Sequence, residues 1–132
     1  MLTNPSITKL HEIRMSAMAA AFSQQLENPQ FNELSFEERF SMLVDAEWNT
    51  RKSNHLTRLI KKAGYAVPSA CVEDIFFSAG RQLDKVQILR LASCLYIENA
   101  NNVIILDATG TGKTYLACAL GMAANRNYYE TR

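Results

Sequence analysis

Apolar residues recur at three- and four-residue steps through the first part of the chain, and this spacing predicts one amphipathic helix. Asn4 or Thr3 can cap its start, and Pro5 suits the first turn because proline has no N–H that needs a partner. Asn28 and Pro29 end it, since a residue before proline avoids the helical region. The apolar face comprises Ile7, Leu10, Ala17, Met18, Ala21, Phe22 and Leu26.

A second helical pattern runs over residues 36–63 and has clear signals at both ends. Ser35 and Glu38 have the spacing of a capping box, in which each side chain binds a backbone N–H of the first turn. Gly64 suits the left-handed position that ends a helix. Because the apolar stripe changes side midway, two alternatives stay open: one long helix that changes partner, or two helices broken near Ser53.

Three aromatic residues, Phe36, Phe40 and Trp48, lie in the first half of this pattern. We expect them to pack in the core against the first helix, which is the commoner place for large apolar side chains. The alternative is an aromatic patch that faces a partner.

Residues 65–82 have weak periodicity and contain Pro68 and Gly80, so they predict a linker. A further helix is expected from Asp84, a suitable cap, to Tyr96 or Ile97.

Composition sets the class of protein but not its function. Apolar residues make up 48% of the chain and charged residues 20%, which is ordinary for a soluble domain. The formal charge of +1 gives no general argument for nucleic-acid binding. Three scattered cysteines and two distant histidines indicate neither a disulfide framework nor a metal-ion cluster. No segment looks like a signal peptide or a membrane span, so a cytoplasmic protein is expected.

The strongest chemical signal follows a short apolar run at residues 102–106. This β-branched run is typical of a buried strand in a parallel sheet. It leads into a loop that ends in Gly-Lys-Thr, and residues 115–126 are predicted to be helical. Strand, glycine-bearing loop and helix in this order are the setting that a phosphate-binding loop (Walker A motif) requires.

The residue types of the loop suit ATP and Mg²⁺. Gly110 and Gly112 let the backbone N–H groups point inward at phosphate oxygens. Lys113 can reach the β- and γ-phosphates, and the Thr114 hydroxyl can bind Mg²⁺. Asp107 stands where the motif has its first glycine, and its carboxylate would repel the phosphates. The expected nucleotide-binding residues are Ala108, Thr109, Gly110, Thr111, Gly112, Lys113 and Thr114.

These elements predict a mainly α protein with an α/β portion near its end. The expected organisation is a helical module at residues 1–64, a linker at 65–82, and the start of a P-loop ATPase domain at 83–132. In the helical module, four residues fall on one helical face and could contact DNA phosphates: Arg51, His55, Arg58 and Lys62. The alternative is a solvated helix end whose positive charges complement the helix dipole.

Several stretches resemble the IstB family, the ATPase helpers of insertion-sequence transposition, which are related to DnaC-like helicase loaders. The resemblance is carried by residues 35–39, 56–63, 83–85, 88–92, 96–98, 102–104 and 109–117. It implies an AAA+ fold, ATP and Mg²⁺ as cofactors, DNA and a cognate transposase as partners, and self-association. Lys113 and Thr114 carry over as phosphate and magnesium contacts, whereas Asp107 replaces a glycine of the family.

The resemblance also implies functional parts that these residues do not contain. A P-loop ATPase holds Mg²⁺ with an acidic residue on a later strand and orients the attacking water with another group. We therefore expect a truncated ATPase that does not hydrolyse ATP by itself, and assign no catalytic residue. Two alternatives remain: a helical protein- or DNA-interaction module that does not use nucleotide, and a fragment of a helicase loader.

Overall fold

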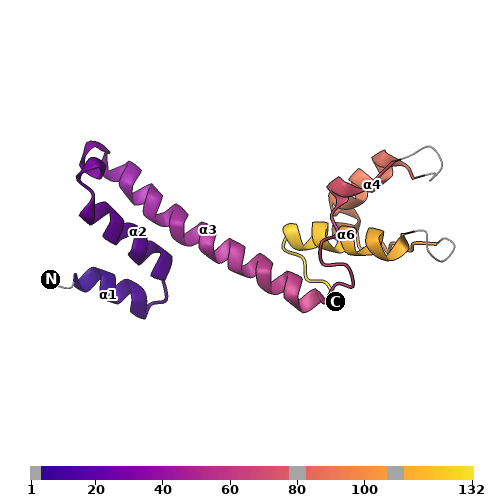
Figure 1. Cartoon of the computed structure of the whole chain (residues 1–132), viewed down its shortest axis with the longest axis horizontal. Helices are drawn as coiled ribbons and strands as arrows, with labels where there is room; N and C mark the ends of the chain where they lie inside the picture. The colour runs from indigo at the N-terminus through magenta and orange to yellow at the C-terminus, as the bar shows by residue number, and fades with distance from the viewer. Residues whose placement is uncertain (1–3, 78–82, 107–111) are drawn as a thin grey trace. The chain divides into compact units, whose positions relative to one another are not determined.

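The computed structural model describes residues 4–77, 83–106 and 112–132 and divides into two compact units, Met1–Asn54 and His55–Arg132. All regular secondary structure in these described ranges is helical, as Figure 1 shows. The prediction of a mainly α protein is therefore confirmed. The long helix α3 (Phe36–Ala63) contributes residues to both units.

Two helices, α1 (Pro5–Glu12) and α2 (Ser16–Glu27), replace the single helix predicted at the start of the chain. The break lies at Arg14, whose φ of 62° is left-handed. The N–H of Met15 donates to the carbonyl of Leu10 at 2.8 Å, and the N–H of Arg14 donates to that of His11 at 3.0 Å. These bonds form a Schellman-type helix end. The single-helix prediction was wrong because an arginine occupies a position where glycine is the usual signal.

Helix α3 is continuous, which confirms a single long helix over residues 36–63 and excludes a break near Ser53. The Glu38 N–H donates to the Ser35 hydroxyl at 3.2 Å, and the Ser35 N–H donates to the Glu38 carboxylate at 2.8 Å. The predicted capping box is therefore formed. At the other end Gly64 has a φ of 62°, as the helix-ending position requires.

The aromatic residues of α3 lie on the surface of the first unit. Phe36, Phe40 and Trp48 are 73%, 52% and 59% exposed, and the rings of Phe36 and Phe40 stack with centroids 5.9 Å apart. The expectation that they pack in the core was wrong. The less exposed α3 side chains of this unit include instead Leu43, Ala46 and the buried Glu47.

The second unit is organised around α6 (Lys113–Arg126), which confirms the predicted helix after the phosphate loop. Its buried residues are Cys118, Ala119, Leu120, Met122, Ala123, Ala124 and Asn125. Helix α4 (Lys85–Ala92) and the 3₁₀ helix η2 (Val72–Asp74) pack against it.

Asp84 caps α4 as predicted, because its carboxylate accepts a bond from the Val86 N–H at 3.0 Å. The helix ends earlier than expected, and a separate short helix α5 (Leu95–Glu98) follows. Cys94 stands between the two with a φ of 66° and is almost fully buried. As at Arg14, a residue other than glycine in the left-handed conformation divides what the apolar pattern predicts to be one helix.

Residues 101–106 have no regular secondary structure, and the expected strand is absent from the described residues. Val103, Ile104 and Leu106 are 37%, 78% and 86% exposed. A strand exists only as part of a ladder, and no described segment offers this run a partner. In the described ranges no helix combines the length and apolar character needed to cross a bilayer.

Candidate nucleotide-binding site

The described part of the predicted phosphate loop is the start of α6. Gly112 precedes the helix with a φ of 92°, a conformation that favours glycine. Lys113 and Thr114 are the first two residues of the helix. The remaining predicted contacts, Ala108, Thr109, Gly110 and Thr111, lie outside the described residues, as does Asp107.

The helix start has the electrostatic character that an anion needs. Gly112 provides no side-chain cap for the amides of the first turn, and such amides leave a positive partial charge at the helix N-terminus. Lys113 adds a full positive charge at the same end. Since α6 is largely buried from Cys118 to Asn125, the rest of the unit fixes the direction in which this end points.

A cavity of about 400 Å³ lies directly beside Gly112. This volume falls within the range of about 300–1,000 Å³ that small-molecule sites have. Its wall is mostly apolar, with one carboxylate at the side, and comprises Asp74, Ile75, Phe76, Leu83, Gly112, Tyr115 and Leu116. A cationic helix end thus adjoins a mostly apolar cavity.

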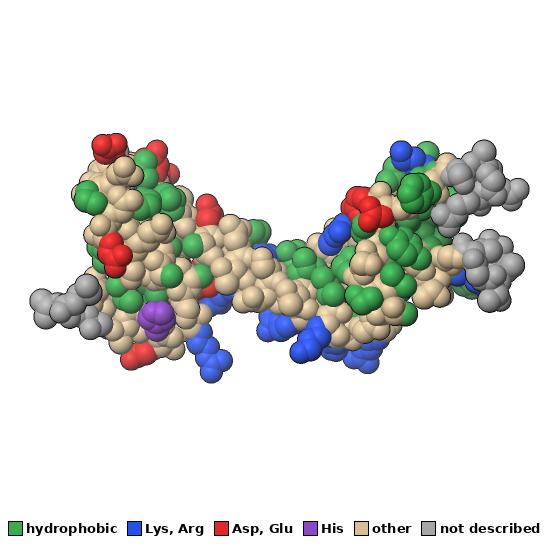
Figure 2. Space-filling model, viewed as in Figure 1, with side chains coloured by type: hydrophobic (Ala, Val, Ile, Leu, Met, Phe, Trp, Pro, Cys, Tyr) green, Lys and Arg blue, Asp and Glu red, His purple; other side chains and the backbone are tan. Residues whose placement is uncertain are grey.

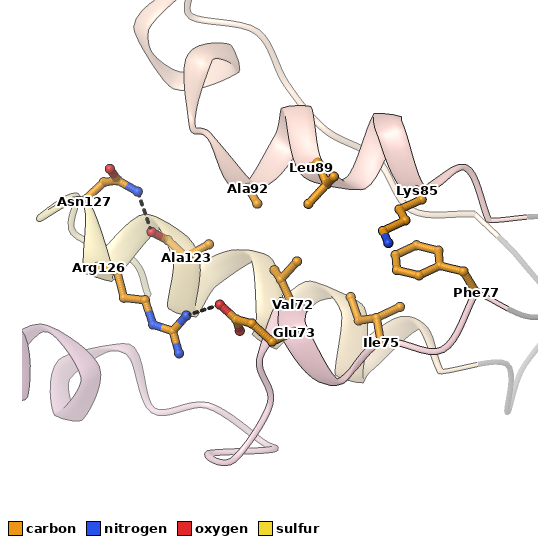
Figure 3. A pocket seen from close by; sticks show the side chains of 10 residues that line it. All are labelled: Val72, Glu73, Ile75, Phe77, Lys85, Leu89, Ala92, Ala123, Arg126 and Asn127. Atoms are coloured by element: carbon orange, nitrogen blue, oxygen red, sulfur yellow. Dashed lines mark hydrogen bonds and ion pairs between the residues drawn. The ribbon is translucent and has the colours of Figure 1, made fainter.

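The segment that precedes the cavity wall is held on α6 by three contacts. The Cys71 N–H donates to the Tyr115 hydroxyl at 3.4 Å. Buried Ala70 packs on Cys118 and Ala119. The Arg126 guanidinium donates to the Glu73 carboxylate at 2.8 Å, as Figure 3 shows. Residues 65–77, which the sequence suggests as part of a linker, therefore contribute to the core of this unit.

Tyr65 forms a further anchor at the other end of α6. Its hydroxyl donates to the side chain of Asn125, which is fully buried, and lies 2.9 Å from the Thr131 hydroxyl. Burial raises the pKa of Tyr65 above its ordinary value of 10.0, which favours the protonated hydroxyl that donates to Asn125. The ring lies on Gly121, where a Cβ atom would be only 2.7 Å from the ring carbon Cε1.

A second cavity of about 430 Å³ shares Ile75 as part of its wall (Figure 3). Leu89 and Ala92 of α4 face Val72 and Ala123 across it, and the Lys85 ammonium lies 6.0 Å from the centre of the Phe77 ring. Gly112 does not line this cavity. Of these two cavities, only the first adjoins the described part of the predicted phosphate loop.

The four residues suggested for DNA contact have different surroundings. In the first unit, Arg51 pairs with Glu47 at 3.5 Å and donates to the Arg14 carbonyl at 3.1 Å. In the second unit, the His55 ring stacks on Tyr128, and Lys62 pairs with Glu130 at 2.8 Å.

Arg58 is exposed and makes no ion pair within the described ranges. Sequence reasoning did not identify Tyr128 and Glu130, and it did not identify Ile75, Phe76 and Leu116 beside Gly112. No local pattern marks the contacts of Tyr128, Glu130, Ile75 and Phe76, because these contacts join segments that lie far apart in the chain.

A match to the family of IstB-like ATP binding proteins covers residues 8–132. The chain belongs to this family. The resemblance to the IstB family is therefore confirmed, and the name of this family includes ATP binding.

The curated relatives of this IstB-like chain are proteins of insertion sequences. A protein of insertion sequence IS1162 from Pseudomonas fluorescens is 40% identical over 98% of the chain and 56% of its own length. The insertion-sequence protein y4pL of Sinorhizobium fredii is 34% identical over 96% of the chain and 51% of its own length. The names of both include ATP binding. The chain spans about half the length of these relatives.

Proposed function

We propose that this chain binds ATP, with the phosphates at the start of α6 and the base in the adjoining cavity. The observation that carries the proposal is the position of the 400 Å³ cavity, whose wall includes the same Gly112 that precedes Lys113 and Thr114. Membership of a family named for ATP binding supports it.

In this proposal Lys113 binds the phosphates, and Thr114 is the ligand through which a nucleotide-bound Mg²⁺ is held. Helix dipole and lysine charge together attract the polyanion. Asp107 opposes them, because two like charges about 4 Å apart repel by roughly 4 kcal/mol at an intermediate dielectric. We expect Asp107 to weaken binding and the positive end of α6 to offset part of this repulsion.

A substitution in the cavity wall tests where the base binds. Phe76 is 78% exposed, so Phe76→Ala removes a stacking surface with little effect on the core. Loss of an aromatic that stacks on a base costs about 1–3 kcal/mol, or roughly tenfold in the dissociation constant of ATP. Binding of inorganic tripolyphosphate, which has no base, is expected to stay unchanged.

Phe40→Ala is the matched control, because Phe40 is a similarly exposed phenylalanine in the other unit. It should alter neither dissociation constant. Equal weakening of ATP and tripolyphosphate by Phe76→Ala would show that Phe76 supports the fold and does not contact the base.

For the whole protein we propose a helper role in DNA transposition, with DNA and a cognate transposase as partners and self-association on DNA. The insertion-sequence names of the relatives support this role over that of a helicase loader. The proposal for residues 1–132 is limited to binding. Hydrolysis needs an acidic Mg²⁺ ligand and a water-orienting group, and we assign neither to these residues.

The exposed aromatic residues of α3 favour a second candidate, a protein-interaction module that does not depend on nucleotide. Exposed aromatics of this kind are common anchors of protein interfaces. Trp48→Asp should then abolish binding of the cognate transposase in a pull-down with purified proteins, with or without ATP. Undiminished capture would exclude Trp48 from such an interface.

A further inference from the structure

Residues 128–132 return to the C-terminal part of α3 within the second unit (Figure 1). The Tyr128 ring stacks on His55, with centroids 5.4 Å apart and planes inclined by 23°. The Lys62 ammonium lies 2.8 Å from Oε1 of Glu130. Thr131 bonds to Tyr65, just beyond the end of the helix. The segment therefore runs along the helical face that the sequence suggests for DNA contact.

Glu130 lies between two positive side chains. The same oxygen, Oε1, accepts from Lys62 at 2.8 Å and from Nε of Arg132 at 3.3 Å. Hydrogen bonds from Lys62 and Arg132 lower the pKa of Glu130, so the carboxylate stays charged further into the acidic range than an ordinary glutamate. One anionic oxygen bound by a lysine and an arginine is also the arrangement that a DNA phosphate adopts on a protein surface.

Further positive side chains around Lys62 and Arg132 extend these two residues into a larger positive surface. Arg58 is exposed one helical turn before Lys62 and has no ion pair among residues that the structure describes. Figure 2 shows Lys and Arg side chains gathered near the C-terminal end of α3. The Lys62, Glu130 and Arg132 side chains are 54%, 45% and 81% exposed. Because solvent and salt screen such pairs, an incoming phosphate can replace the carboxylate.

We infer that Glu130 is an internal competitor for a DNA phosphate on a surface formed by Arg58, Lys62 and Arg132. Bound DNA displaces Glu130 from Lys62 and Arg132, while the stack of Tyr128 on His55 keeps the segment on the helix. Glu130 thereby lowers the affinity for DNA. The inference rests on the proposed DNA binding and adds the group that regulates it.

The test is binding of a 20-base-pair fluorescein-labelled duplex by the native chain and by Glu130→Gln, measured by anisotropy over a range of salt concentrations. Releasing two cations adds up to two phosphate contacts, each of which steepens the dependence of log K on log salt by about 0.9. At physiological salt the expected gain in affinity is on the order of tenfold. Glu73→Gln is the matched control, because it removes the same charge from another exposed pair, with Arg126. It is expected to give a much smaller gain.

The possible outcomes distinguish a failure of the role inferred for Glu130 from a failure of the proposed DNA binding. Higher affinity and a steeper salt dependence for Glu130→Gln alone support the inference, and Arg58→Ala should then weaken binding by both proteins. DNA binding that is unchanged or weakened by Glu130→Gln overturns the inference but leaves the proposed DNA contact in place. If neither protein binds the duplex at low salt, the proposed DNA contact fails, and the inference fails with it. Equal gains for Glu130→Gln and Glu73→Gln would reduce the effect to net charge and overturn it as well.

Discussion

Gly121→Ala tests whether the Tyr65 ring lies on α6, one of the contacts that attach residues 65–77 to the helix of the candidate site. A Cβ atom at position 121 would lie 2.7 Å from Cε1, 3.0 Å from the hydroxyl oxygen and 3.2 Å from Cζ of Tyr65. Comfortable contacts need about 3.5–4 Å, so the ring must move by close to 1 Å. Its hydroxyl is held by Asn125 and Thr131, which opposes that movement.

Two effects of opposite sign determine the change in the free energy of unfolding. Overpacking costs about 1–3 kcal/mol, and disturbing the hydrogen bonds of Tyr65 adds about 1 kcal/mol. Against this, alanine is better than glycine in a helix interior by about 1 kcal/mol. We expect Gly121→Ala to destabilise the chain by roughly 1–3 kcal/mol.

The effect of Gly121→Ala on the free energy of unfolding should reverse its sign when the Tyr65 ring is removed first. In a Tyr65→Ala background only the helix preference remains, so Gly121→Ala should stabilise by about 1 kcal/mol. Urea unfolding followed by circular dichroism gives both values, and the double-mutant cycle gives a coupling of roughly 2–4 kcal/mol.

Gly64→Ala serves as the control for this cycle. Gly64 is left-handed with nothing within 4 Å of an added Cβ. Its substitution should cost about 1–2 kcal/mol in both backgrounds. If Gly121→Ala stabilises the chain with Tyr65 present, the close approach of the ring does not exist and the account of this unit is wrong.

Two further predictions concern the helix break and the acidic group near the end of the chain. Arg14→Gly should stabilise the first unit by about 1 kcal/mol in urea unfolding, because glycine adopts the left-handed conformation without strain; a loss of stability would mean that the arginine side chain contributes more than the turn costs. For Glu130, Lys62 and Arg132 lower the pKa from the ordinary value of 4.5. A lowered pKa stabilises the fold above pH 4.5, and this contribution disappears as the pH falls through the folded-state pKa. The melting-temperature difference between the native chain and Glu130→Gln should therefore persist from pH 7 to 5 and shrink below pH 4.5; a constant difference down to pH 3 would contradict the pairing.

The sequence predicts elements whose determinants are local. The capping box at Ser35 and the glycine at position 64 delimit α3, and Asp84 marks the start of α4. Lys113 and Thr114 are placed at the start of a helix by the phosphate-loop pattern. Each of these signals spans a few neighbouring residues, so a single sequence is enough to find them.

The features that we could not predict from the sequence depend on contacts between distant residues or on residues in atypical conformations. Arg14 and Cys94 break helices in a left-handed conformation that neither residue type signals. The anchor between Tyr65 and Asn125 joins residues 60 positions apart, and so has no local pattern. The run at residues 102–106 has the composition of a strand, but a ladder depends on a partner segment, which composition alone does not provide.

Titration calorimetry with Mg²⁺ and ATP tests the central claim, that the start of α6 is a phosphate site, most directly. The native chain is compared with Lys113→Ala and Asp107→Gly, and circular dichroism checks that all three proteins are folded. The account predicts measurable binding by the native chain, loss of binding in Lys113→Ala and tighter binding in Asp107→Gly, because one change removes a positive charge and the other a negative charge. Binding that both substitutions leave unchanged, or no binding even by Asp107→Gly, would contradict the claim that this helix start holds the phosphates.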